Sequence, residues 1–161
     1  MEAKDTDKID ESEIVVRRSC EIKDGIISSL TDLFCKQADP FCWSKSQFLS
    51  ELDNMNHSYI WFLEKESVIW GALLALLIPP ECEVRHFCVN YRVRRRGVAK
   101  KILNRVINDC KNLFNIKKVF LEVATTNKAA LGLYRQVGFR VAAIRSGYYD
   151  GKDAYLMSLE M

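Results

Sequence analysis

Residues Val89 to Leu103 read VNYRVRRRGVAKKIL, in which a strand ends, three consecutive arginines and a glycine follow, and a helix with an apolar face begins. Backbone N–H groups at the start of a helix have no partner inside the helix, and the helix dipole favours negative charge beside them. Glycine lets a ligand approach these groups closely, so the order of strand, basic loop and helix fits a pyrophosphate. The alternative for this segment alone is a basic turn that is exposed to solvent.

Positive charge is concentrated around this segment. The chain has 161 residues and a formal net charge of +3, which is small. Residues Val84 to Asn108, however, contain eight lysines or arginines and no acidic residue. This concentration predicts that an anionic group binds there.

The sequence on both sides alternates between strand patterns and helix patterns. Apolar residues at helical spacing predict helices over 22–36, after a capping box of Ser44 and Gln47, from Gly97, and between an N-cap at Asn127 and a stop at Gly138. Runs of β-branched and aromatic residues predict strands at Glu13–Arg18, Tyr59–Leu63, Val68–Ile78, Glu83–Asn90, Lys118–Ala124, Phe139–Arg145 and Ala154–Glu160. This order predicts one three-layer α/β domain over residues 13–161, with a partly antiparallel sheet.

Three features of the whole chain limit its class. Residues 1–12 are acidic and lack an apolar core, which predicts a disordered tail and neither a signal peptide nor a transit peptide. The longest apolar run, Val68–Ile78, is far shorter than the roughly 20 residues that cross a bilayer, so we expect no membrane span. Six cysteines are scattered without a CxxC pair and only two histidines are present, so we expect reduced thiols, a cytoplasmic location and no metal site.

Two motifs in this order resemble the GNAT superfamily of N-acetyltransferases. The RxxGxA motif at Arg94–Ala99 is similar to the loop that binds the pyrophosphate of coenzyme A in that superfamily, with Ala99 where glycine is commoner. The NxxAxxLY motif at Asn127–Tyr134, followed by Gly138-Phe139, resembles the downstream helix and strand of the superfamily. The resemblance implies a GNAT-type domain whose mixed, mostly antiparallel sheet has about six to seven strands and helices on both faces.

Three further segments resemble one family of that superfamily, the ribosomal-protein-alanine N-acetyltransferases of the RimI type. They are WSKSQF at Trp43–Phe48, LEVATTN at Leu121–Asn127 and RSGYYDGKDAYLM at Arg145–Met157. The resemblance implies an enzyme that uses acetyl-CoA as cosubstrate and acetylates the N-terminal α-amine of a protein, an alanine-starting ribosomal protein. Transfer would be direct, within a ternary complex. Trp43 and Phe48 are expected in the core or on the floor of the cleft.

The resemblance also implies roles for individual residues. Glu122 matches the general base for the amine and Tyr134 the general acid for the departing thiolate, whereas the residues alone allow an exposed strand carboxylate and a core aromatic. Tyr148 and Tyr149 match paired tyrosines beside the peptide-acceptor cleft, with ordinary hairpin packing as the alternative. The residues implied to contact acetyl-CoA are Phe87, Cys88, Val89, Arg94, Arg95, Arg96, Gly97, Val98, Ala99, Lys100, Asn127 and Tyr134.

Two other functions are open from the sequence. The superfamily shares its cofactor site among many substrates, so the acceptor could be a small amine or a lysine side chain. A function of a different class is a non-catalytic module that binds nucleic acid through the basic residues 92–101. That segment lacks interleaved aromatic residues for stacking on bases, and a binding module has no need of Glu122 and Tyr134, so we expect no nucleic-acid partner.

Overall fold

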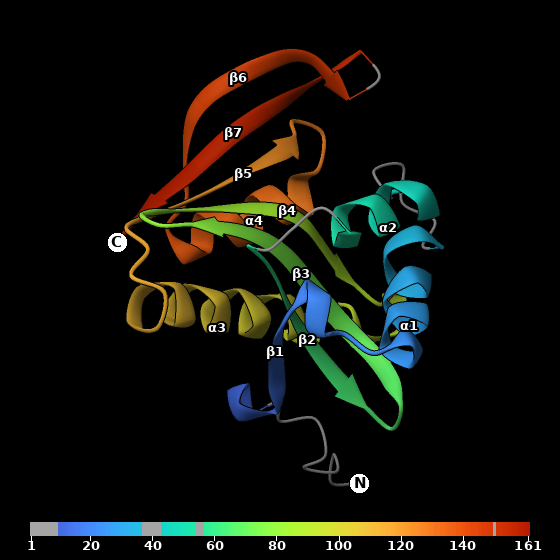
Figure 1. Cartoon of the computed structure of the whole chain (residues 1–161). Coiled ribbons are helices and arrows are strands. Elements are labelled where there is room, and N and C mark those ends of the chain that lie inside the picture. The colour runs from blue at the N-terminus through green and yellow to red at the C-terminus, as the bar shows by residue number, and fades with distance from the viewer. Residues whose placement is uncertain (1–9, 37–42, 54–56, 150) are drawn as a thin grey trace, which may run out of the picture.

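One sheet contains all seven strands that the structure describes, in the spatial order β1-β2-β3-β4-β5-β7-β6 (Figure 1). The computed structural model describes residues 10–36, 43–53, 57–149 and 151–161. The strands are β1 (Ile14–Arg18), β2 (Ser58–Lys65), β3 (Val68–Ile78), β4 (Glu81–Val89), β5 (Lys118–Ala124), β6 (Arg140–Tyr149) and β7 (Lys152–Glu160). The helices are α1 (Asp24–Cys35), α2 (Lys45–Asp53), α3 (Val98–Asn112) and α4 (Lys128–Val137), with short 3-10 helices at Glu11–Glu13, Ser19–Glu21 and Tyr91–Val93.

The described sheet is mixed and mostly antiparallel. Every neighbouring pair of strands is antiparallel except β4 and β5, which are parallel. The expected three-layer α/β fold is therefore confirmed. Of the expected acidic tail, residues 1–9 lie outside the described residues, and that expectation stays a prediction.

Helices cover both faces of the sheet, and each face has its own apolar core. Helices α3 and α4 pack on one face, where Ile102 is fully buried against the sheet. Helices α1 and α2 pack on the opposite face, where Phe48 is fully buried. Leu73 and Leu74 are adjacent on β3 and belong to the two different cores, as the alternation of side chains along a strand requires.

Strand β4 contains a bulge and then separates from β5. Leu74 of β3 lies opposite His86, whereas the next residue lies opposite Val84, so Arg85 is an extra residue in β4. Strand β4 pairs with β5 only from Glu81 to Val84. The remaining residues of β4 extend beyond this ladder, and the cavities of the candidate site lie where the two strands diverge.

Local sequence signals for helix ends are confirmed. Ser44 and Gln47 form the expected capping box, in which the backbone N–H of Ser44 donates to Gln47 Oε1 at 2.8 Å and that of Gln47 donates to Ser44 Oγ at 3.2 Å. Asn127 Oδ1 accepts from the N–H of Ala130 at 3.2 Å. Gly138 ends α4 in the left-handed conformation, with φ of 108°.

Strand ends differ from the sequence-based expectation where pairing decides them. Strand β4 was expected from Glu83 and begins at Glu81, because Glu81 already pairs with both β3 and β5. Strand β6 was expected to end at Arg145 and continues to Tyr149, because its ladder with β7 closes only at the pair Tyr149 and Lys152. The expected turn at 150–152 includes Asp150, which lies outside the described residues.

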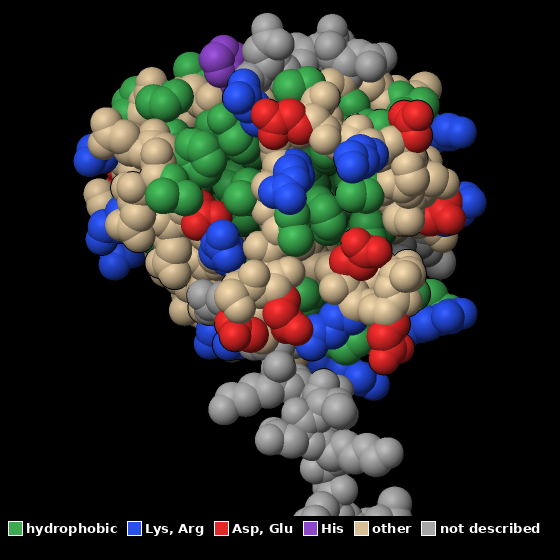
Figure 2. All heavy atoms as spheres, turned by 60° about the horizontal axis from the view of Figure 1, so that its bottom comes forward, with side chains coloured by type: hydrophobic (Ala, Val, Ile, Leu, Met, Phe, Trp, Pro, Cys, Tyr) green, Lys and Arg blue, Asp and Glu red, His purple; other side chains and the backbone are tan. Residues whose placement is uncertain are grey.

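The molecular surface carries charges of both signs. On the face shown in Figure 2, acidic and basic side chains lie interspersed among hydrophobic ones. None of the helices described here is long and apolar enough to cross a membrane.

Candidate active site

The larger of two cavities at the divergence of β4 and β5 has a volume of about 480 Å³. It is bordered by the end of β4, the loop before α3, and α4 with its capping residue. Its lining comprises Phe87, Cys88, Val89, Val93, Arg94, Arg95, Gly97, Val98, Ala99, Lys100, Asn127, Ala129, Ala130, Leu133, Tyr134 and Gln136. The structure thus brings together all the residues expected to contact acetyl-CoA except Arg96, which is not part of this lining.

The loop before α3 has the geometry of an anion site. Arg95 and Gly97 adopt positive φ of 65° and 81°, and the first backbone hydrogen bond of the helix runs from the N–H of Lys101 to the carbonyl of Gly97. The N–H groups of residues 98–100 therefore precede the helical ladder, and these three residues line the cavity. Arg94 Nε donates to the carbonyl of Val89 at 3.2 Å, which ties the loop to the end of β4. A pyrophosphate fits these orphan donors and the neighbouring cations.

The end of β4 supplies backbone groups to the same cavity. Phe87, Cys88 and Val89 lie beyond the ladder with β5 and line the cavity. An amide-containing chain such as the pantetheine arm fits this strand edge, because it can take the place of a neighbouring strand. The Cys88 thiol is buried and donates to the carbonyl of Leu33 at 3.5 Å, which directs it toward α1. The thiol of Cys88 is therefore engaged with the helix on the opposite face of the sheet.

Helix α4 places Tyr134 at this cavity. Tyr134 is 7% exposed and belongs to the core beneath α3 and α4, and its ring centroid lies 5.7 Å from that of Phe139. The position of Tyr134 is compatible with both roles that the sequence left open, because its ring is packed in the core while the residue also lines the cavity. The cap at Asn127 fixes where the helix begins and lines the cavity as well.

A smaller cavity of about 150 Å³ adjoins the earlier part of β4. Val119, Leu121 and Val123 of β5 belong to the core beneath α3 and α4, so Glu122 points to the opposite face. The lining of this smaller cavity comprises Trp43, Glu83, Val84, Arg85, Phe120, Leu121, Glu122 and Tyr148. Glu122 and Tyr148 thus lie at one cavity, and the side chain of Tyr149 lies outside the described part of the chain.

The two cavities follow one another along β4. Residues 83–85 line the smaller cavity and residues 87–89 line the larger one. His86 lies between them in sequence, stacked on Trp43 with ring centroids 4.7 Å apart. An acceptor in the smaller cavity and a cofactor in the larger one would therefore be neighbours along the same strand.

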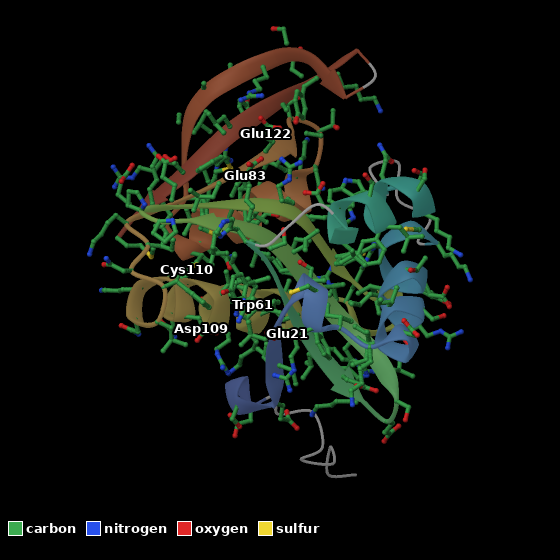
Figure 3. The ribbon with its side chains drawn as sticks, in the orientation of Figure 1. Glu21, Trp61, Glu83, Asp109, Cys110 and Glu122 are labelled. Atoms are coloured by element: carbon green, nitrogen blue, oxygen red, sulfur yellow. The ribbon has the colours of Figure 1, made fainter. Side chains whose placement is uncertain are left out.

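Sequence reasoning missed several residues of the smaller cavity. Glu83 lies on β4 beside β5, which carries Glu122 (Figure 3). Arg85 Nη1 contacts Glu83 at 2.7 Å, and Arg85 Nε contacts Glu51 of α2 at 2.8 Å. The hydrogen bonds to Glu51 and Glu83 raise the pKa of Arg85 above its usual value, so Arg85 stays charged. Glu83 and Arg85 meet at this cavity because of the pairing of β4 with β3 and β5 and the packing of α2, none of which is visible in the sequence.

Metal ligands do not gather at this site. Within the described ranges, no group of three or more histidine, cysteine, aspartate or glutamate residues is arranged to hold a metal ion. The buried thiols of Cys82 and Cys110 lie next to each other, and the hydrogen bond with Cys110 together with burial raises the pKa of Cys82.

Residues 27–139 match the model of a family described as the acetyltransferase (GNAT) family. The chain belongs to this family. A protein from Saccharolobus solfataricus named N-alpha-acetyltransferase is 31% identical over 115 residues, which is 69% of this chain and 66% of that protein. The match thus spans just under two thirds of the archaeal relative. The [ribosomal protein bS18]-alanine N-acetyltransferase of Escherichia coli K12 is 29% identical over 129 residues, 77% of this chain and 84% of that enzyme.

A solved structure has the same fold as this chain. The crystal structure of the ribosomal-protein-S18-alanine N-acetyltransferase from Escherichia coli superimposes with a TM-score of 0.79, at 22% sequence identity, over 91% of this chain and 93% of that chain. Family membership and relatives named for N-alpha acetylation together support an N-acetyltransferase as the class of enzyme.

Proposed function

We propose that this GNAT protein transfers an acetyl group from acetyl-CoA to the N-terminal α-amine of a protein, in a direct step within a ternary complex. One observation carries the proposal: the larger cavity, lined by the loop before α3, and the smaller cavity, lined by Glu122, adjoin consecutive segments of β4. A cofactor and an acceptor bound in them would meet at this strand. The names of the archaeal and Escherichia coli relatives support an α-amine as the acceptor.

The proposed chemistry has one bond formed and one bond broken. The neutral amine attacks the thioester carbonyl carbon, so that a C–N bond forms and the C–S bond breaks. Glu122 takes the proton that the amine must lose, and Tyr134 donates a proton to the departing thiolate. The N–H of Val89 polarises the thioester carbonyl. Free α-amines have a reference pKa near 8, so an appreciable fraction is already neutral at physiological pH. Glu122 therefore has to accept a proton only from the amines that are still protonated.

We propose an alanine-starting ribosomal protein as the acceptor. The relative from Escherichia coli, whose name specifies alanine and ribosomal protein bS18, supports this choice. A cavity of about 150 Å³ compares with a cavity that holds one benzene molecule, so it suits a first residue with a small side chain. The aromatic side chains of Trp43, Phe120 and Tyr148 around it provide apolar walls and faces that attract an ammonium group.

A nucleic-acid-binding module is less compatible with the same geometry. Arg94 bonds back to β4, and Arg95 and Lys100 line the concave cofactor cavity rather than an open stripe. We therefore propose an enzyme with acetyl-CoA and a protein N-terminus as partners, and a cytoplasmic location.

The test is acetylation of matched peptides, with the products identified by mass. One peptide begins with alanine and contains an internal lysine, its control is the same peptide with a blocked N-terminus, and further peptides begin with serine, methionine or leucine. We expect one acetyl group on the α-amine of the alanine peptide and none on its blocked control. Acetylation of the blocked peptide, or of spermidine-like amines alone, would replace the α-amine by a side chain or a small amine as the acceptor.

A further inference from the structure

Arg145 lies on β6 and reaches across to β5, where its guanidinium Nη1 lies 2.8 Å from Oε1 of Glu122. The Glu122 side chain is only 16% exposed, whereas that of Arg145 is 52% exposed. Glu122 thus sits inside the cavity wall and Arg145 approaches it from the solvent side. The contact with Oε1 restricts the rotation that the Glu122 carboxylate would otherwise have.

The local backbone aims Arg145 at this carboxylate. Arg145 pairs with Ala154 of β7, and the register is irregular directly after it, up to Tyr149. Within that irregular segment Gly147 adopts φ of 67°, and its N–H donates to Asp153 Oδ1 at 3.0 Å. Arg145 also stacks over the ring of Tyr148, with its guanidinium carbon 5.5 Å from the ring centroid. One guanidinium therefore joins the carboxylate and the aromatic wall of the smaller cavity.

The position of Arg145 separates this role from a role in folding. Residues 140–148 of β6 are exposed, and β6 is the edge strand of the described sheet, so Arg145 contributes little to either core. It is also absent from the lining of the larger cavity. Removing it should therefore leave the fold and the acetyl-CoA site intact and change only the smaller cavity.

We propose that Arg145 is a positioning residue for acyl transfer, which holds the Glu122 carboxylate in the orientation that receives the proton of the acceptor amine. This inference rests on the proposed function, because it assumes that Glu122 takes the proton of the amine. Arg145 does not touch the reacting atoms and acts through Glu122. Its effect must therefore disappear when Glu122 can no longer act.

A double-mutant cycle on the full chain tests this dependence. The alanine-starting peptide is acetylated by the parent, by Arg145→Ala, by Glu122→Gln and by the double variant, with kcat and KM measured for both substrates. We expect Arg145→Ala to lower kcat roughly ten- to a hundredfold, as misplacement of a reacting group does, with the KM for acetyl-CoA unchanged. In the Glu122→Gln background the same substitution should change kcat by less than about threefold.

Two variants serve as controls. Arg140→Ala removes the same residue type from the first position of β6 and should keep the parental kcat, because Arg140 pairs with Ser158 and Arg145 with Ala154, toward opposite ends of β7. Arg145→Lys keeps the charge without the planar fork and should recover part of the lost kcat. The inference alone would be overturned if Arg145→Ala kept the parental kcat. It would also be overturned if the losses of kcat from Arg145→Ala and Glu122→Gln multiplied in the double variant. A parent protein that acetylates no peptide would instead overturn the proposed function and this role with it.

Discussion

Replacing Gly97 by alanine tests whether the backbone of the loop before α3 is what holds the cofactor. Gly97 has φ of 81°, and a Cβ built on it meets no atom within 4 Å, so the substitution adds strain without a clash. An L-residue in the left-handed region costs about 1–2 kcal/mol. If the loop keeps its shape, the free energy of unfolding falls by this amount, which lowers Tm by about 2–8 °C in a chain of this size.

The same strain can instead weaken the affinity for acetyl-CoA. If the free loop relaxes to negative φ, the cofactor must restore the strained form, and Kd rises by up to about 5- to 30-fold for 1–2 kcal/mol. The lost stability and the lost affinity should together amount to this strain. Urea unfolding gives the first quantity and isothermal titration with acetyl-CoA gives the second.

Gly132→Ala is the matched control. Gly132 lies inside α4, its added Cβ also meets nothing within 4 Å, and it does not line the cofactor cavity. Alanine in a helix should raise the free energy of unfolding by about 0.5–1 kcal/mol and leave Kd unchanged. If Gly97→Ala matched Gly132→Ala in free energy of unfolding and in Kd for acetyl-CoA, the backbone of this loop would not be what holds the cofactor. Gly97→Glu adds a carboxylate to the strain and should abolish stabilisation by acetyl-CoA in a thermal-shift titration.

Three further substitutions test single roles at the site. Tyr134→Phe keeps the buried ring and removes the phenol, so Kd for acetyl-CoA should stay near the parental value while kcat falls by about 10²–10⁴, and an unchanged kcat would leave Tyr134 with a packing role only. Glu122→Gln should lower kcat and change its pH profile if Glu122 is the base, whereas a raised peptide KM with parental kcat would show that it only orients the amine. Asn127→Ala removes the cap on α4 and should cost about 1 kcal/mol of unfolding free energy and weaken acetyl-CoA binding, while Asn127→Ser should restore stability but not affinity.

Short-range signals made most of the secondary structure predictable. The Ser44–Gln47 capping box, the Asn127 cap and the Gly138 stop each depend on residues within one helical turn, and each is present as expected. The loop that lines the larger cavity was accessible to the same reasoning, because it is continuous in sequence. The other residues expected to contact acetyl-CoA came from the resemblance to the GNAT superfamily. The roles assigned to these residues stay predictions until the substitutions are measured.

The acceptor side of the site was much less predictable. The sequence pointed to Glu122 and Tyr148, but gave no reason to connect Arg145 with Glu122, which lies 23 residues earlier and joins it only through the pairing of β6, β7 and β5. Trp61 and Asp109 are likewise distant in sequence, yet the indole Nε1 donates to the carboxylate at 2.8 Å. Both residues are labelled in Figure 3.

The sequence by itself determined the order of strands and helices, the caps of α2 and α4 and the basic loop before α3, because each depends on neighbours along the chain. Tertiary structure alone decided the bulge at Arg85, the divergence of β4 from β5 and the partner of Glu122. The bulge shifts the following residues of β4 to the opposite face, so the contribution of this strand to each cavity depends on its pairing with β3. Contacts of this kind are fixed by which strands become neighbours, and a one-residue change of register would redistribute them all.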